Sequence, residues 1–249
     1  MKLMHILAAS VAVLASAACN AEKAADSAAA SSAPIKPIAA PNNGDWSAMV
    51  SETPEGGFIM GNPNAPVKLV EYGSMTCPHC ATFQEEAEKT LIDKYVKTGQ
   101  VSFEFRNYVR DPYDITATLI ARCGGPTSFF GLTRGLFAEQ QDWVGKLQLV
   151  PPDQQQALMG MPPQQQFSTI ARLAGFPQWA AMRGVPAARS AACLADEAAT
   201  TKLVQMNSDA TSQYPGFPGT PTFILNGTML ENTANWELLE PKLRAAIGA

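Results

Sequence analysis

The segment VKLVEYGSMTCPHC, residues 67–80, places two cysteines where a predicted strand gives way to a predicted helix. Residues 67–72 are apolar and rich in β-branched side chains, which is typical of a buried strand. Gly73 and Ser74 form a turn signal, and Pro78 suits the first position of a helix because no N–H is needed there. The two cysteines therefore lie between the carboxyl end of a strand and the first turn of a helix.

The helix expected after the turn gives the two thiols different roles. Apolar side chains recur every three or four positions over residues 80–95, and the pattern ends at Gly99. Cys77 lies at the helix N-terminus, where unpaired N–H groups and the helix dipole favour negative charge. His79, when protonated, adds a cation. We predict that Cys77 has a lowered pKa and is the attacking sulfur, and that Cys80 on the buried face is the resolving thiol.

Two other uses of a Cys-X-X-Cys pair need to be weighed. A zinc half-site would need more ligands, and the sequence has no second close cysteine pair and only one other histidine, His5. A purely structural disulfide would close almost no loop and would restrain little of the unfolded chain. We therefore predict a redox-active disulfide between Cys77 and Cys80, with no metal ion and no organic cofactor.

Length and charge limit the protein class. The chain has 249 residues, a net charge of −4 and a pI near 5.2, which fits one domain or a domain with an insertion. Charged residues are sparse and form no basic stripe, so we expect no nucleic-acid partner.

The N-terminus predicts an export signal. Lys2 precedes an apolar run at residues 6–14 that is too short to span a bilayer comfortably. Ala-Ser-Ala at residues 15–17 fits a signal-peptidase site, whereas Cys19 resembles the lipidated first residue of a bacterial lipoprotein. An uncleaved anchor is a third alternative. We expect residues 1–18 to be a signal peptide and the protein to be periplasmic, with a membrane tether if Cys19 is lipidated.

Residues 19–54 are rich in Ala, Ser and Pro and show no periodic apolar face. Such a composition cannot bury enough surface to offset its ordering entropy, which predicts a flexible tether. The segment also lacks heptads, so it offers no oligomerisation stalk and we expect a monomer.

The remaining chain alternates between sheet and helix patterns. Residues 101–105 alternate apolar and polar side chains and predict a strand that completes a parallel, right-handed βαβ unit. Residues 111–214 show helical periodicity broken by Gly and Pro, which predicts a helical subdomain that includes one long helix over residues 187–214.

The end of the chain predicts two strands and a helix. Residues 221–225 read as a strand, Asn226-Gly227 is a strong two-residue hairpin turn, and residues 228–230 return antiparallel. Apolar positions in residues 236–247 predict a closing helix. The element order is therefore βαβ, helical insertion, ββα, which defines an α/β fold.

Without Cys19 the chain keeps four cysteines, which suggests two disulfides in an exported protein. The simplest second pair is Cys123 with Cys193. Their bond would close a loop of about 70 residues inside the helical segment, worth roughly 4 kcal/mol in the chain-entropy model. The alternative is two buried free thiols, because connectivity cannot be deduced from sequence.

The Cys-Pro-His-Cys sequence, together with GNPNAPV at residues 61–67 and GTPTF at residues 219–223, resembles the DsbA-like thiol:disulfide interchange proteins of the thioredoxin superfamily. The resemblance implies a thioredoxin fold. Residues 55–110 and 215–249 would form the thioredoxin-like domain, and residues 111–214 would be its helical insertion.

The resemblance also implies roles for three further residues. Thr220-Pro221 matches the family's cis-proline loop, which presents backbone to an extended substrate, although proline at a strand start is often only an edge residue. Glu71 matches a buried acid that relays a proton to Cys80, with a pKa raised by burial. The alternative is a solvent-facing Glu71 opposite Lys68. Arg106 is a candidate partner for the carboxylate.

By resemblance, the protein is a periplasmic oxidoreductase that donates its disulfide to reduced exported polypeptides. A membrane, quinone-coupled oxidase of the DsbB type would reoxidise it. Two alternatives are a disulfide isomerase or reductase kept reduced by a membrane partner, and a non-enzymatic Cys/Met copper carrier.

Overall fold

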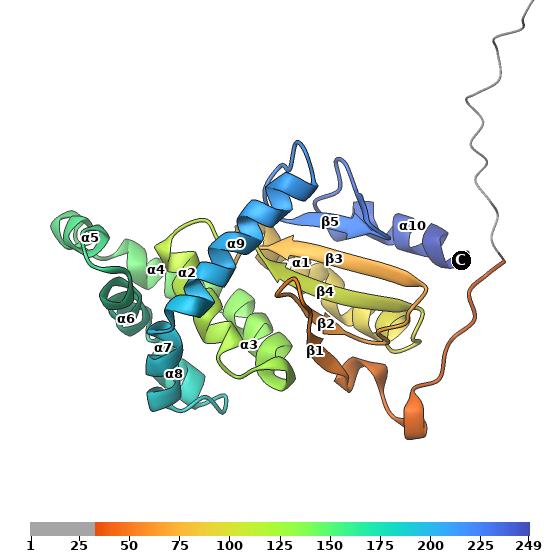
Figure 1. Cartoon of the computed structure of the whole chain (residues 1–249), viewed down its shortest axis with the longest axis horizontal. Helices are drawn as coiled ribbons and strands as arrows, with labels where there is room; N and C mark the ends of the chain where they lie inside the picture. The colour runs from red at the N-terminus through yellow and green to blue at the C-terminus, as the bar shows by residue number, and fades with distance from the viewer. Residues whose placement is uncertain (1–32) are drawn as a thin grey trace, which may run out of the picture. The chain divides into compact units, whose positions relative to one another are not determined.

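A six-stranded sheet organises the chain in the computed structural model, which describes residues 33–249 (Figure 1). The strand order is β1-β2-β4-β3-β5-β6, with β3 and β4 parallel and every other neighbouring pair antiparallel. The central parallel pair confirms the βαβ unit predicted around the cysteines. The strands are β1 (Val50–Glu52), β2 (Phe58–Met60), β3 (Val67–Gly73), β4 (Val101–Asn107), β5 (Thr222–Leu225) and β6 (Thr228–Met229).

Helices cover both faces of the sheet. α1 (Pro78–Thr90) follows β3 and continues as the π-helical turn η3 (Leu91–Val96). It packs beside the C-terminal helix α10 (Trp236–Ile247), and the Phe83 ring lies 6.4 Å from the Trp236 ring. α9 (Glu197–Gln213) lies across the other face, as Figure 1 shows. The sheet and α10 therefore both hold α1, the helix that begins at the two cysteines.

A helical insertion connects β4 to β5, as predicted, and it contains eight helices in the described residues. The predicted long helix over residues 187–214 is wrong, because it breaks at Asp196, whose side chain accepts the Ala199 N–H and starts α9 anew. The others are α2 (Pro112–Arg122), α3 (Pro126–Ala138), α4 (Gln140–Gln148), α5 (Pro152–Met159), α6 (Pro163–Ala174), α7 (Phe176–Ala181) and α8 (Ala187–Leu194).

A disulfide links the first helix of this insertion to α8. Cys123, at the end of α2, is bonded to Cys193 of α8, with the Cα atoms 5.8 Å apart. Both cysteines belong to the insertion, so the bond restrains the helical subdomain internally and does not join it to the sheet.

The flexible tether predicted for residues 19–54 is wrong where the structure describes it. Trp46 is buried and its indole N–H donates to the Ile38 carbonyl at 2.7 Å, while the Ile35 N–H donates to the Ile247 carbonyl. β1 pairs with β2, which the sequence pattern also missed because both strands have only three residues. One buried tryptophan and backbone pairing outweigh the polar composition. The expected signal peptide and Cys19 lie outside the described residues.

The C-terminal hairpin follows its sequence prediction. Asn226 and Gly227 both have positive φ, 49° and 84°, as a two-residue hairpin turn requires, and they join β5 to β6. The Asn226 side chain also accepts the Lys68 N–H at 2.8 Å. The turn therefore fixes β5 against β3, the strand that leads to the cysteines. Within residues 33–249 no helix is long and apolar enough to cross a membrane.

Candidate active site

The two cysteines lie at the start of α1, as predicted. Cys77 is the N-cap residue with an extended backbone, and Pro78 is the first helical residue. Both thiols are reduced in the structure and buried, Cys77 with 2% and Cys80 with 0% of its surface exposed. Pro78 and His79 between them are exposed. A small part of Cys77 therefore stays exposed beside Pro78 and His79, whereas Cys80 is fully enclosed.

The environment of Cys77 stabilises its thiolate. A hydrogen bond from the Cys80 thiol makes the largest contribution, and burial opposes it. Hydrogen bonds from the backbone N–H groups of Cys80 and His79 add to the first, so the pKa of Cys77 falls from 9.0 to about 5. His79 thus acts through its backbone N–H at the helix N-terminus, where the sequence prediction had invoked its imidazole.

Cys80 has the opposite electrostatic environment. Burial raises the pKa of the Cys80 thiol well above 9.0, and its hydrogen bond to Cys77 and the charges of Glu71 and Cys77 raise it further. At neutral pH one sulfur is ionised and the other keeps its proton. This difference fits Cys77 as the nucleophile and Cys80 as the resolving thiol.

The structure brings Thr220 and Pro221 to the dithiol across 143 residues of sequence. The Thr220–Pro221 peptide bond is cis, and the Cys77 sulfur lies 3.2 Å from the Thr220 carbonyl oxygen, to which it donates in its protonated form. Pro221 is buried and leads directly into β5. The Thr220 hydroxyl is buried and has no hydrogen-bond partner among the described residues. The Thr220 carbonyl therefore faces the nucleophilic sulfur, and a buried hydroxyl without a partner lies on the same residue.

Glu71 is buried, so the solvent-facing alternative is wrong. Its surface is 1% exposed, and neither carboxylate oxygen has a hydrogen-bond partner within residues 33–249. Burial, and then the charge of Cys77, raise the pKa of Glu71 well above its ordinary value of 4.5. Arg106 does not partner it, since its guanidinium donates to Glu104 at 2.7 Å. The Glu71 carboxyl group therefore holds its proton more tightly than a free carboxyl group and lies in the electrostatic range of both thiols.

Three side chains of the insertion contact the loop that carries Cys77, and the sequence reasoning missed all three. Asp114 of α2 accepts the Met75 N–H at 2.8 Å, Gln140 of α4 donates to the Cys77 carbonyl at 3.0 Å, and Arg110 donates to the Thr76 carbonyl at 2.8 Å. Burial raises the pKa of Asp114 to about 7. The only related sequence signal was the helix start after Asp111. It predicts a helix cap, but it does not indicate which residues the side chains of that helix would contact.

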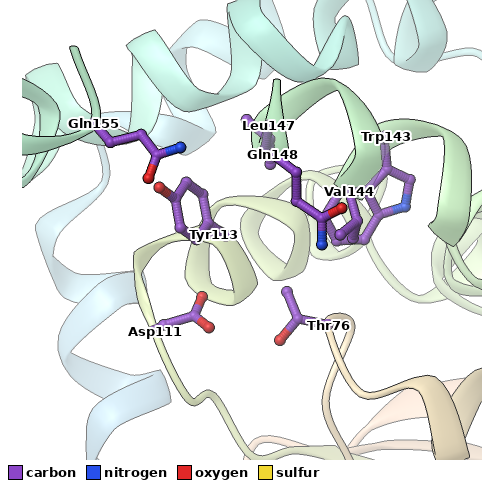
Figure 2. Close-up of a pocket in the computed structure, with 8 residues that line it drawn as sticks. All are labelled: Thr76, Asp111, Tyr113, Trp143, Val144, Leu147, Gln148 and Gln155. Carbon is purple, nitrogen blue, oxygen red and sulfur yellow. The ribbon is translucent and has the colours of Figure 1, made fainter. Parts of the chain in front are cut away.

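A pocket of about 220 Å³ borders the same loop. Figure 2 shows the Thr76 and Asp111 side chains on one side of it and side chains of α4 and α5 on the other. This arrangement gives the dithiol loop a neighbouring surface made by the insertion. Its lining residues are Thr76, Asp111, Tyr113, Trp143, Val144, Leu147, Gln148 and Gln155. Among the described residues no group of three or more His, Cys, Asp or Glu side chains could hold a metal ion.

Comparison with known proteins gives a consistent family. Residues 53–244 match the model of a family described as Thioredoxin. The crystal structure of a protein-disulfide isomerase from Novosphingobium aromaticivorans is 35% identical with a TM-score of 0.73, and the match covers 77% of this chain and 97% of that one. Wolbachia pipientis α-DsbA1 is 21% identical with a TM-score of 0.58, over 80% of this chain and 94% of its own.

A candidate protein-disulfide oxidoreductase from Rickettsia bellii is 28% identical over 179 residues, which are 72% of this chain and 60% of the relative. The chain therefore spans about three fifths of the length of that curated relative. Taken with the fold and the dithiol site, these matches show that the chain belongs to the thioredoxin family. Its fold is also that of α-DsbA1.

Proposed function

We propose that this protein donates a Cys77–Cys80 disulfide to reduced polypeptides exported to the periplasm. The observation that supports this most is the pKa of Cys77, which is lowered to about 5. A stabilised thiolate favours the reduced enzyme, which makes the disulfide form a strong oxidant, as in DsbA.

The exchange takes two steps. A substrate thiolate attacks Sγ of Cys77, a mixed disulfide forms, and the Cys77–Cys80 bond breaks with Cys80 as the leaving thiolate. A second substrate thiolate attacks the substrate sulfur of the mixed disulfide, and Cys77 leaves as its stabilised thiolate. Two electrons pass from the substrate dithiol to the enzyme disulfide, and Cys80 takes up a proton. Neither step calls for a metal ion or an organic cofactor.

Thr220 supplies the surface for an extended substrate. Its carbonyl oxygen lies 3.2 Å from the Cys77 sulfur, and its buried hydroxyl has no partner among the described residues. A substrate strand that pairs with this backbone would bring its own cysteine to Cys77. The Thr220 hydroxyl would then be free to donate to a substrate group.

Glu71 supplies the proton that Cys80 needs when it leaves. We expect Glu71→Gln to slow the formation of the mixed disulfide by about ten- to a hundredfold at pH 7, because an amide cannot transfer a proton and general acids contribute at this scale. Stopped-flow measurement of a single turnover with a reduced peptide tests this. A rate equal to that of the wild type would show that Glu71 transfers no proton.

Glu104→Gln is the matched control for this variant. Glu104 is also a buried strand glutamate, 7% exposed, but it pairs with Arg106 and does not contact the thiols. We expect this control to lose stability and to keep the single-turnover rate of the wild type.

We further propose a periplasmic location, a monomeric state and reoxidation by a membrane, quinone-coupled protein of the DsbB type. Transfer of two electrons to such a partner restores the disulfide after each cycle. A cleaved signal peptide and an acylated Cys19 belong to the same proposal. The intact mass of the mature protein tests cleavage and acylation together.

Disulfide isomerisation is the second candidate function. It is favoured by the 35% identity to the Novosphingobium protein, which is described as a protein-disulfide isomerase. The same dithiol would serve this reaction if a partner kept it reduced.

A direct assay separates the two functions. We expect the oxidised protein to convert the thiols of a reduced, unfolded substrate protein into disulfides in a single turnover, with loss of its own disulfide. An enzyme that leaves reduced substrate unoxidised, and that rearranges scrambled disulfides only in its reduced form, would replace the proposal with the isomerase.

A further inference from the structure

The loop between β3 and α1 is held by side chains from the insertion rather than by the sheet. Gln140 donates from Nε2 to two carbonyl oxygens of this loop, that of Met75 at 2.8 Å and that of Cys77 at 3.0 Å. Asp114 accepts the Met75 N–H at 2.8 Å and the Ser74 hydroxyl at 2.5 Å. The polar backbone atoms on both sides of Met75 are thus bound by residues that lie about 40 and 65 positions further along the chain.

These bonds are shielded from water. Gln140 is 6% exposed and Asp114 is 0% exposed. Loss of the Gln140 amide leaves the Met75 carbonyl without a donor and the Cys77 carbonyl with the Ala81 N–H alone, so the loop would move to satisfy the Met75 oxygen.

The hydrogen bond from Gln140 to the Cys77 carbonyl connects the insertion to the residue that carries the reacting sulfur. This oxygen accepts both the Gln140 amide and the Ala81 N–H at 3.2 Å, the first hydrogen bond of α1. The Gln140 amide therefore sets the position of the N-cap residue relative to the helix that stabilises its thiolate. It also directs a partial positive charge at the carbonyl of the residue that carries the sulfur.

We propose that Gln140 is a positioning residue for thiol–disulfide exchange, which holds the Cys77 backbone so that its sulfur faces the N-terminus of α1 and Thr220. Asp114 supports it by holding Ser74 and Met75 from the other side of the loop. The inference deepens the proposed function and rests on it. The helical insertion then has a chemical role, because it helps to set the reduction potential of the Cys77–Cys80 pair.

The insertion offers a matched control in Gln166. This glutamine is 7% exposed, lies in the first turn of α6 and donates its amide to the Leu158 carbonyl at 3.0 Å. The variants Gln140→Met and Gln166→Met remove the same kind of buried bond, but only the first bond touches the dithiol loop.

The test measures the Cys77 thiolate of the reduced full-length protein by its ultraviolet absorbance over a pH titration. We expect Gln140→Met to lower the thiolate-to-thiol ratio at pH 5 by about three- to tenfold, and Gln166→Met to leave it unchanged. The equilibrium constant with glutathione at pH 7 should become less oxidising by the same factor. Urea unfolding of both variants reports the loss of stability that they share.

Equal thiolate ratios in Gln140→Met and the wild type would overturn the proposal, and so would an equal change in both variants. If Gln140→Met does not fold, Gln140→Asn replaces it in the test. The shorter side chain keeps a buried amide but cannot reach both carbonyl oxygens. We expect this variant also to lower the thiolate-to-thiol ratio of Cys77 at pH 5. The titration uses no substrate, so it gives its answer even if the substrate assay shows that the wild type is not an oxidase.

Discussion

Cys77→Ser is expected to abolish thiol–disulfide exchange, with a loss of about a thousandfold or more, because a serine hydroxyl is not ionised at neutral pH and does not attack a disulfide. Cys80 cannot replace it. Cys80 is fully buried, and its own pKa is raised well above 9.0 by that burial. Reduction of a disulfide peptide, followed by fluorescence, measures the loss.

Cys80→Ser is the informative counterpart. This variant keeps the Cys77 thiolate but lacks the resolving thiol, so the mixed disulfide with a substrate should accumulate and be visible as a shift in intact mass. If Cys80→Ser formed no adduct while Cys77→Ser did, the roles of the two sulfurs would be reversed.

The second large effect is on stability and its pH dependence. The pKa of Cys77 is about 5 in the folded protein and near 9.0 when the thiol is free of its surroundings, so the folded reduced form binds fewer protons between these values. Its stability is therefore expected to rise with pH across this window, by roughly 5 kcal/mol in total and by about 2 to 3 kcal/mol at pH 7. In the oxidised form Cys77 is part of a disulfide and does not titrate, so the stability of that form lacks this pH dependence.

Glu71 and Asp114 act in the opposite direction. Burial raises both pKa values, so the folded protein binds more protons than the unfolded chain and loses stability as pH rises. Both carboxyl groups are present in the reduced and the oxidised form, and Cys80 keeps its proton in the folded and the unfolded chain well below pH 9. Below about pH 8 the difference between the two forms therefore reports mainly on Cys77 and its coupling to Glu71. Urea unfolding of each form from pH 5 to pH 9 measures this difference. An oxidised form that is the more stable one at pH 7, or a difference independent of pH, would contradict the assignment.

The sequence predicts the parts of this site that depend on local pattern. The β3 strand, the helix start at Pro78 and the Asn226-Gly227 turn each have a short signal, and each was predicted correctly. The pKa of Cys77 is lowered mainly by the Cys80 thiol and the helix N–H groups, and the pKa of Cys80 is raised mainly by burial. Local reasoning can reach both causes, because the helix start and its buried face have a sequence signal.

What the sequence does not predict depends on contacts between distant residues. Gln140 reaches the dithiol loop across 63 to 65 positions, and nothing distinguishes it from the other glutamines of the insertion. Trp46 and β1 were hidden within a polar, proline-rich segment whose average composition argued for disorder. Such contacts are set by tertiary packing, which single-sequence periodicity does not report.

A redox titration of Cys77–Cys80 in glutathione buffers tests the central claim most directly. The reference values are about −120 mV for DsbA and about −270 mV for thioredoxin. A thiolate stabilised as Cys77 is predicts a potential above about −200 mV, on the oxidising side of the midpoint between them. A potential as low as that of thioredoxin would contradict the account, because the disulfide could not then be donated to exported proteins.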